Sequence, residues 1–264
     1  MTKTLGILNI TDDSFSDGGK YNNPETALQH ALQLHNAGAD YVELGPSSTH
    51  PDSKASDAET EIEKISGVLR ELIERKIPVA IDSFHPQTQI YAAENGATLI
   101  NDVTGFSDNK VHKDLAKLDC TLVPMFSVAE EASKQSFKTT EVLSAMYTFF
   151  EERLKQLQAA GVKKNRIVID PGMGFFLGSD EQTSFKMLSE IPAIRKKLQH
   201  EIFISVSRKS FLRNATGLSI ESSLPATLSA ELKAIELGAS YVRTHDVAAL
   251  KAALLVRSRI ETAA

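Results

Sequence analysis

Residues 77–103 read IPVAIDSFHPQTQIYAAENGATLINDV, and this stretch contains the unit that repeats along the whole chain. It holds two apolar runs, Ile77–Ser83 and Ala97–Val103, joined by a segment with Pro86 near its start and Gly96 at its end. Proline fits the first turn of a helix, and glycine fits a helix C-terminal cap. The stretch therefore predicts a strand, a helix and a second strand.

The same unit extends in both directions from this stretch. Segments with apolar residues at helical spacing lie between further apolar runs, and Pro24, Gly38, Gly161 and Gly238 mark helix ends as Pro86 and Gly96 do. The clearest helical segments are Pro24–Ala37, Asp57–Arg75, Thr139–Ala160 and Ser222–Leu237. The eight apolar runs are Thr4–Ile10, Ala39–Gly45, Ile77–Ser83, Ala97–Val103, Cys120–Ser127, Arg166–Gly172, Ile202–Ser210 and Ala239–Asp246.

Eight alternations of strand and helix predict a parallel sheet with right-handed crossovers. In 264 residues they fit the α/β class and a TIM (β/α)8 barrel. A doubly wound open sheet is the alternative, but no G-x-G-x-x-G motif follows the first run. We see no linker or low-complexity tract, so residues 1–264 are predicted to form a single domain.

Composition excludes several classes of partner. The net charge of −5 is the opposite of the basic surface that nucleic-acid binding favours. No apolar stretch reaches the roughly 18 residues of a membrane span, and the chain enters a strand too early for a signal peptide. Cys120 is the only cysteine, lies in an apolar run and is expected to be a core residue. We expect a cytoplasmic protein that binds neither nucleic acid nor membrane.

Polar side chains gather where the apolar runs end. In a barrel, those ends form one rim, which is where active sites lie. The rim is also expected to carry three long loops, Thr11–Asn23, Pro46–Ser56 and Phe211–Glu221. The polar residues at the run ends are Asn9, Glu43, Asp82, Asn101, Asp102, Asp170, Ser207, Arg208, Lys209, Arg243, Thr244, His245 and Asp246.

Their chemistry suggests two subsites. Asp82, Asn101 and Asp170 could read the edge of a planar heterocycle, although either aspartate could instead cap the next helix. Arg243 and His245 alternate on the last predicted strand, so both should face one way and bind an anion, unless the histidine is a structural core residue. The cluster Ser207–Ser210 adds two cations, and the segment Gly172–Gly178 offers two aromatic residues to a flat ligand or to the core.

Through these residues and the motifs around them, the sequence resembles the dihydropteroate synthase family, the pterin-binding barrels of folate biosynthesis. The resemblance runs from Gly6 to about Asp246, and the order of the motifs is what makes it specific. The motifs are Gly6-Ile-Leu-Asn-Ile-Thr11, Asp13-Ser-Phe-Ser-Asp-Gly-Gly19, Ile81-Asp82-Ser83, Ile100-Asn101-Asp102-Val103, Asp170-Pro-Gly-Met-Gly-Phe175, Ser207-Arg-Lys-Ser210 and Arg243-Thr-His-Asp246.

The resemblance implies a transferase that joins 4-aminobenzoate to (7,8-dihydropterin-6-yl)methyl diphosphate and releases pyrophosphate. It implies that Asp82, Asn101, Asp170 and Lys209 hold the pterin, and that Arg243 and His245 take the diphosphate, with Mg²⁺ near Asn9. Lys209, Arg243, His245 and Asp82 would be the catalytic residues. Thr49, Ser210 and Phe175 would help position the aminobenzoate, and the further substrate-binding residues would be His50, Phe176 and Met125.

Two departures from the family pattern stand out. The usual Gly-Glu-Ser-Thr-Arg-Pro-Gly motif is Pro46-Ser-Ser-Thr-His-Pro-Asp52, so His50 replaces a loop arginine. The segment after Asp170 is about two residues longer than usual and carries both Phe175 and Phe176. Similar features occur in the sulfonamide-resistant branch, and an added phenylalanine could exclude the bulkier sulfonamide. Which phenylalanine is the added one stays open.

Three other functions compete with this interpretation. Methyltetrahydrofolate corrinoid methyltransferases share the barrel and the pterin carboxylates, but would not need the Ser207–Ser210 cluster. A non-catalytic pterin-binding paralogue would explain the loss of the loop arginine at His50. A phosphosugar barrel would not need Asp82, Asn101 and Asp170 together. The family also implies a homodimer formed through the later helices, for which residues 222–237 are a candidate surface.

Overall fold

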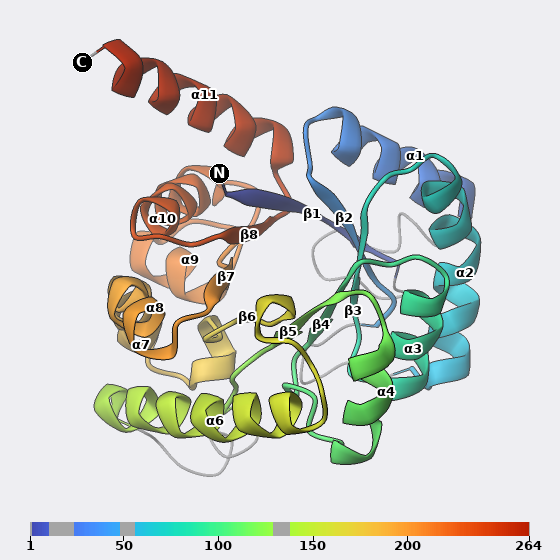
Figure 1. Ribbon diagram of the computed structural model, residues 1–264. Coiled ribbons are helices and arrows are strands. Elements are labelled where there is room, and N and C mark those ends of the chain that lie inside the picture. Colours follow the sequence, from blue (N-terminus) through green and yellow to red (C-terminus); the bar gives the residue numbers. More distant parts are fainter. Residues whose placement is uncertain (1, 11–23, 48–55, 129–137, 264) are drawn as a thin grey trace.

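The computed structural model describes residues 2–10, 24–47, 56–128 and 138–263, which form one ring of parallel strands surrounded by helices (Figure 1). The strands are β1 Lys3–Asn9, β2 Tyr41–Gly45, β3 Val79–Asp82, β4 Leu99–Asp102, β5 Thr121–Pro124, β6 Val168–Ile169, β7 Glu201–Ser205 and β8 Tyr241–Thr244. The helices are α1 Pro24–Asn36, α2 Ala58–Glu74, α3 Pro86–Glu94, α4 His112–Lys117, α6 Thr139–Ala159, α7 Glu181–Ser189, α8 Ile191–Leu198, α9 Ser210–Thr216, α10 Leu224–Glu236 and α11 Val247–Ala263, with short 3₁₀ turns η1 Asn109–Val111, η2 Lys164–Arg166 and η3 Gly174–Leu177.

The predicted barrel is confirmed, and the open-sheet alternative is wrong. The strands follow the order β5-β4-β3-β2-β1-β8-β7-β6, and every ladder is parallel. Two isolated bridges, Leu122 with Ile167 and Met125 with Asp170, join β5 to β6 and close the ring. This seam has no regular ladder, since Pro124 supplies an acceptor but no N–H.

The predicted helix ends are mostly confirmed. Pro86 is at the first turn of α3, and the glycines at 38, 96, 161 and 238 have φ between 99° and 107° just after their helices. Asp57 caps α2 by accepting a hydrogen bond from the backbone N of Thr60. One prediction is wrong: the expected loop Phe211–Glu221 contains most of α9.

The barrel interior is apolar in one layer and largely polar in the next layer along the strands. Seven residues, one from each strand except β2, form a separate apolar cluster inside the ring: Leu5, Ala80, Leu99, Val123, Val168, Phe203 and Tyr241. The outward-facing strand residues instead pack against the helices in the main core. Since strand side chains alternate between the two faces, the residues two positions further along each strand also point inward. That next layer builds the candidate site.

None of the helices in the described part of the chain combines the length and the hydropathy of a membrane span.

Candidate active site

Each strand places one inward-facing residue just above the apolar cluster. On six strands this residue is polar, and it lies at the carboxyl end of the barrel, where the sequence predicted the working rim. The buried polar residues here are Glu43, Asp82, Asn101, Asp170 and Ser205, and Arg243 completes the layer with a side chain 16% exposed. The remaining two positions are Ile7 and Met125.

Arg243 is the centre of this layer. Its Nε donates to Glu43, and its Nη2 lies 2.6 Å from Oδ2 of Asp82. The other Asp82 oxygen accepts from the side-chain amide of Asn101 at 3.0 Å. Burial opposes the charge, but Glu43 and Asp82 raise the pKa of Arg243 above its ordinary value. Four strands that are distant in sequence, β2, β3, β4 and β8, are thereby joined by one polar network.

Glu43 is the member that the sequence analysis did not assign to the site. It was noted as a run-end residue, yet the resemblance gave it no role. Its side chain is fully buried, and burial raises its pKa to about 7 even though Arg243 lowers it. A charged residue in an apolar run was the available signal, because charged side chains are almost never fully buried without a partner.

Asp170 and Lys209 are oppositely charged groups at the ends of the neighbouring strands β6 and β7, and each shifts the pKa of the other. Asp170 is 2% exposed and accepts a 2.8 Å hydrogen bond from the backbone N of Gly172. Burial raises the pKa of Asp170 to about 6, opposed by Lys209. Burial likewise lowers the pKa of Lys209 to about 8, opposed by Asp170. Neither aspartate, 82 or 170, caps a helix, so the capping alternative is wrong for both.

The segment after Asp170 contacts Lys209 directly. Lys209 Nζ donates to the carbonyl of Met173 at 2.9 Å and lies 4.9 Å from the ring centroid of Phe176. The rings of Phe175 and Phe176 are 4.0 Å apart. Gly172 has φ +75°, and a Cβ there would collide with the carbonyl oxygen of Phe126, so only glycine fits this turn.

The position of His245 was predicted from a strand that ends one residue earlier. β8 ends at Thr244, so strand alternation does not extend to His245, whose Nδ1 lies 2.9 Å from Ser207 Oγ. Burial, together with the positive charges of Arg208 and Arg243, lowers the pKa of His245 to about 3. The imidazole is therefore neutral. Because the backbone N of His245 already donates to Ser207 Oγ, that hydroxyl can donate to Nδ1, which favours a proton on Nε2.

Three of the remaining predicted residues, Met125, Ser210 and Asn9, lie around the same rim. Met125 is buried beside the seam, and Ser210 is the exposed first residue of α9. Asn9 ends β1, and a Cβ on Gly45 would be 3.1 Å from Asn9 Oδ1, so the amide lies against the end of β2. Thr49 and His50 lie outside the described residues. Among the described residues, no cluster of three or more His, Cys, Asp or Glu side chains has metal-site geometry.

Asp102, beside Asn101, faces the other way. It accepts from Gln89 and from the backbone N and hydroxyl of Thr104, so it stabilises the chain after β4 rather than the barrel mouth. Adjacent strand residues therefore divide into a site residue and a structural residue, as alternation requires.

A family model described as pterin binding enzyme matches residues 5–245. Dihydropteroate synthase type-3 of Escherichia coli is 44% identical over 97% of this chain and 98% of its own length. The chain belongs to the dihydropteroate synthases of the pterin-binding enzyme family. It is thus an enzyme, a transferase. Dihydropteroate synthase type-2 of Escherichia coli is 41% identical over 100% of this chain and 99% of its own length.

Solved structures agree with this assignment. The synthase from Xanthomonas albilineans with 4-aminobenzoic acid has a TM-score of 0.89 and 31% identity, covering 98% of this chain and 93% of that one. The synthase from Yersinia pestis in a sulfonamide drug complex has a TM-score of 0.91 and 26% identity, covering 100% of this chain and 95% of that one. The same barrel therefore extends over nearly the whole of this synthase.

Proposed function

We propose that this synthase condenses (7,8-dihydropterin-6-yl)methyl diphosphate with 4-aminobenzoate and releases pyrophosphate and 7,8-dihydropteroate. One observation carries the proposal: Asp82, Asn101 and Asp170 lie buried at the mouth of the barrel, with Lys209 beside Asp170. Three planar acceptor groups suit a pterin edge, which presents N–H donors beside a carbonyl. A relative solved with 4-aminobenzoic acid and another solved with pteroic acid, in which a pterin is joined to 4-aminobenzoate, support this choice of substrate and product.

The residues of the layer would act mainly by charge and position. When the C–O bond to diphosphate breaks, positive charge develops on the pterin methylene, and the carboxylates of Asp82 and Asp170 would offset it. Lys209 would donate from Nζ to the pterin. Phe175, Phe176, Met125 and Ser210, with Thr49 and His50 from their loop, would orient the aminobenzoate for attack.

The diphosphate would bind to Arg243 and His245. A guanidinium has five N–H donors, and Glu43 and Asp82 are contacted by two of its nitrogens, so further donors remain for an anion. The neutral His245 would donate from Nε2 without adding charge. Arg243 would therefore supply the positive charge that attracts the diphosphate, and His245 would orient the diphosphate through a hydrogen bond.

Magnesium is consistent with the donor chemistry at this rim. Mg²⁺ prefers oxygen ligands and is usually held by few protein groups together with substrate phosphates. The amide oxygen of Asn9, at the end of β1, is such a group. When bound, the ion would neutralise charge on the departing diphosphate.

Reduced sulfonamide sensitivity is the second part of the proposal. The segment between Asp170 and Gly178 carries two phenylalanine rings with centroids 4.0 Å apart, and Lys209 Nζ lies over the Phe176 ring. Steric exclusion of a bulkier competitor by such rings would spare the smaller aminobenzoate. The replacement of the usual loop arginine by His50 is the second departure that resembles the sulfonamide-resistant branch of the family.

A homodimer is also proposed, through a different surface from the one the sequence suggested. The large exposed apolar residues of the described chain, Leu255, Val256 and Ile260, lie on α11 rather than within residues 222–237. This helix projects from the ring (Figure 1). Its apolar side could pack against a second copy.

The test is pyrophosphate release with the pterin diphosphate, Mg²⁺ and purified enzyme. Release that requires 4-aminobenzoate is expected. Tight pterin binding without turnover would favour the non-catalytic paralogue, and absorbance from a bound corrinoid would favour the methyltransferase. Titration with a sulfonamide in the same assay, compared with the KM for 4-aminobenzoate, tests the second part. Micromolar-level inhibition, as in ordinary family members, would overturn it.

A further inference from the structure

The turn that presents Lys209 contains an unusual backbone residue. The backbone N of Lys209 donates to the carbonyl of Val206, and Arg208, the third residue of this turn, has φ +59°. Glycine or asparagine normally occupies that position, since other residues pay a steric cost there. An arginine held in this conformation requires compensating contacts from its surroundings.

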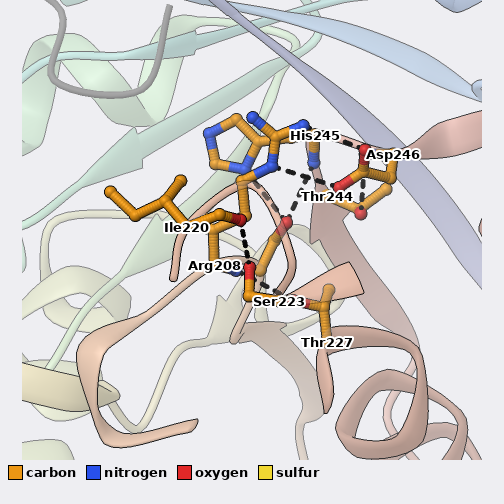
Figure 2. Close-up of polar contacts among 8 residues, drawn as sticks. Arg208, Ile220, Ser223, Thr227, Thr244, His245 and Asp246 are labelled. Carbon is orange, nitrogen blue, oxygen red and sulfur yellow. Dashed lines mark hydrogen bonds and ion pairs between the residues drawn. The ribbon is translucent and has the colours of Figure 1, made fainter. Parts of the chain in front are cut away.

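Arg208 has such contacts through both its main chain and its side chain. Its guanidinium contacts both carboxylate oxygens of Asp246, Nε at 3.2 Å and Nη2 at 2.9 Å. Its backbone N donates to Thr227 Oγ1 at 3.1 Å. Figure 2 shows that these groups converge from the end of β7, the end of β8 and helix α10. Arg208 therefore joins three segments of the chain at one point.

Helix α10 contributes a buried polar stripe to the same place. Ser223, Thr227 and Glu231 are spaced four residues apart, and all three are fully buried. This spacing is normally apolar on a helix that faces a barrel. Ser223 Oγ donates to the carbonyl of Ile220, and Thr227 accepts from Arg208 (Figure 2). The stripe thus faces the turns rather than packing as core.

The two joined turns are those that carry the proposed site residues. Lys209 directly follows Arg208, and His245 directly precedes Asp246. A second link runs parallel to the ion pair: Ser207 Oγ accepts from the backbone N of His245 and contacts its Nδ1. The backbone N of Asp246 is in turn held by Thr244 Oγ1 at 3.1 Å.

We propose that Arg208, Asp246 and Thr227 are positioning residues that fix the distance between Lys209 and His245. The inference rests on the proposed function, because it assumes that Lys209 holds the pterin and His245 the diphosphate. Loosening the Arg208–Asp246 pair leaves both side chains present but lets the two turns move apart. Misplacement of this kind costs rate without removing any reacting group.

The variants that test this are Arg208→Gly, Asp246→Asn and Thr227→Val. Arg208→Gly is decisive, since glycine suits φ +59° and only the side-chain contacts are lost. We expect a drop of about tenfold or more in kcat/KM for the pterin diphosphate and a much smaller change in KM for 4-aminobenzoate. Arg208→Lys should recover part of the loss. Arg208→Gln with Asp246→Asn should cost no more than either change alone.

Two matched controls separate positioning from general destabilisation. Thr183→Val removes the hydroxyl of another buried helical threonine, which contacts Thr139, and Glu261→Gln breaks the Arg257–Glu261 pair on α11. Both should leave the kinetics near those of the parent. Parental kinetics in Arg208→Gly, or equal losses in Thr227→Val and Thr183→Val, would overturn the proposal.

Hydrogen exchange provides a readout that does not depend on turnover. In the parent, amides of residues 206–209 and 244–246 should exchange slowly, and Arg208→Gly and Asp246→Asn should accelerate both segments together. If the parent released no pyrophosphate, the proposed function would fail while this result still decided whether the two turns are coupled. Unchanged exchange in both segments would contradict the coupling.

Discussion

Arg243 and Glu43 are 200 residues apart in sequence and form an ion pair inside the mouth of the barrel. Asp82 binds Nη2 of the same guanidinium. A planar fork of donors can satisfy two carboxylates at once, which an ammonium group cannot do in the same geometry. The pair therefore explains why an arginine stands at this position of β8.

Arg243→Lys should lower both stability and activity. A lysine cannot reach both carboxylates, so one buried acceptor group loses its partner at a cost of about 2 kcal/mol. The free energy of unfolding from urea denaturation checks this, and kcat/KM for the pterin diphosphate should fall about 100-fold. Arg257→Lys on α11 is the control, where an exposed pair predicts a change below about 1 kcal/mol. Equal effects at both positions would contradict the account.

The pH dependence of kcat/KM should be bell-shaped. Asp170 acts as a carboxylate, and its pKa of about 6 predicts loss of activity as pH falls below that value. Lys209 acts as a cation, and its pKa of about 8 predicts loss as pH rises above that value. The apparent pKa values of the two limbs belong to the coupled cluster of titrating groups rather than to Asp170 or Lys209 alone. Asp170→Asn should abolish the acid limb in whatever activity remains, and an acid limb that persists in this variant would show that another group titrates.

Glu231→Gln should stabilise the protein increasingly as pH rises. Burial raises the pKa of Glu231 to about 8, opposed by Thr244, so the folded state keeps a proton that the unfolded state releases above about pH 4.5. The parent therefore loses up to about 1.4 kcal/mol per pH unit between pH 5 and 8, and glutamine removes this loss. Denaturation at pH 5, 6 and 7 measures the difference between the two proteins.

Glu236→Gln is the matched control for that series. It changes an exposed glutamate on the same helix, which is paired with Lys233 and has a lowered pKa. Its effect should not vary between pH 5 and 7. A constant difference for Glu231→Gln would mean that this carboxylate is ionised in the folded state.

Phe175→Ala and Phe176→Ala should identify the ring that excludes sulfonamides. Because Lys209 Nζ lies over the Phe176 ring, we expect Phe176→Ala to have the larger effect on inhibition. Sulfonamide inhibition should tighten about tenfold or more, with a smaller change in KM for 4-aminobenzoate. If neither variant becomes more sensitive, steric exclusion by this segment is ruled out.

The barrel could be predicted from the sequence because the strand–helix pattern repeats eight times, and prolines and glycines mark the ends of the helices. The sequence also predicted Asp82, Asn101 and Asp170 at one rim, because strand ends of a barrel meet there. The contacts of Arg243 with Glu43 could not be predicted in this way, since they join β8 to β2, which are far apart in sequence and lie on either side of β1. The α9 error has a local cause: Arg213 to Gly217 looks polar and loop-like, while only Phe211 and Leu212 are buried.

The contact of His245 with Ser207 was missed for a related reason. Strand alternation was extended two residues beyond the point where hydrogen bonding stops, and the Ser207 contact comes from the neighbouring turn. The direction of a side chain beyond a strand end is determined by the turn that follows, not by the alternation of side chains along the strand. This is also why the link between Arg208 and Asp246 became visible only in three dimensions.

The most direct test of the central claim is pyrophosphate release by the parent and by Lys209→Ala under identical conditions. The account predicts 4-aminobenzoate-dependent release by the parent and a loss of about 100-fold or more in the variant, which keeps its fold by thermal unfolding. Tight pterin binding with no release by the parent, or undiminished release by Lys209→Ala, would contradict it.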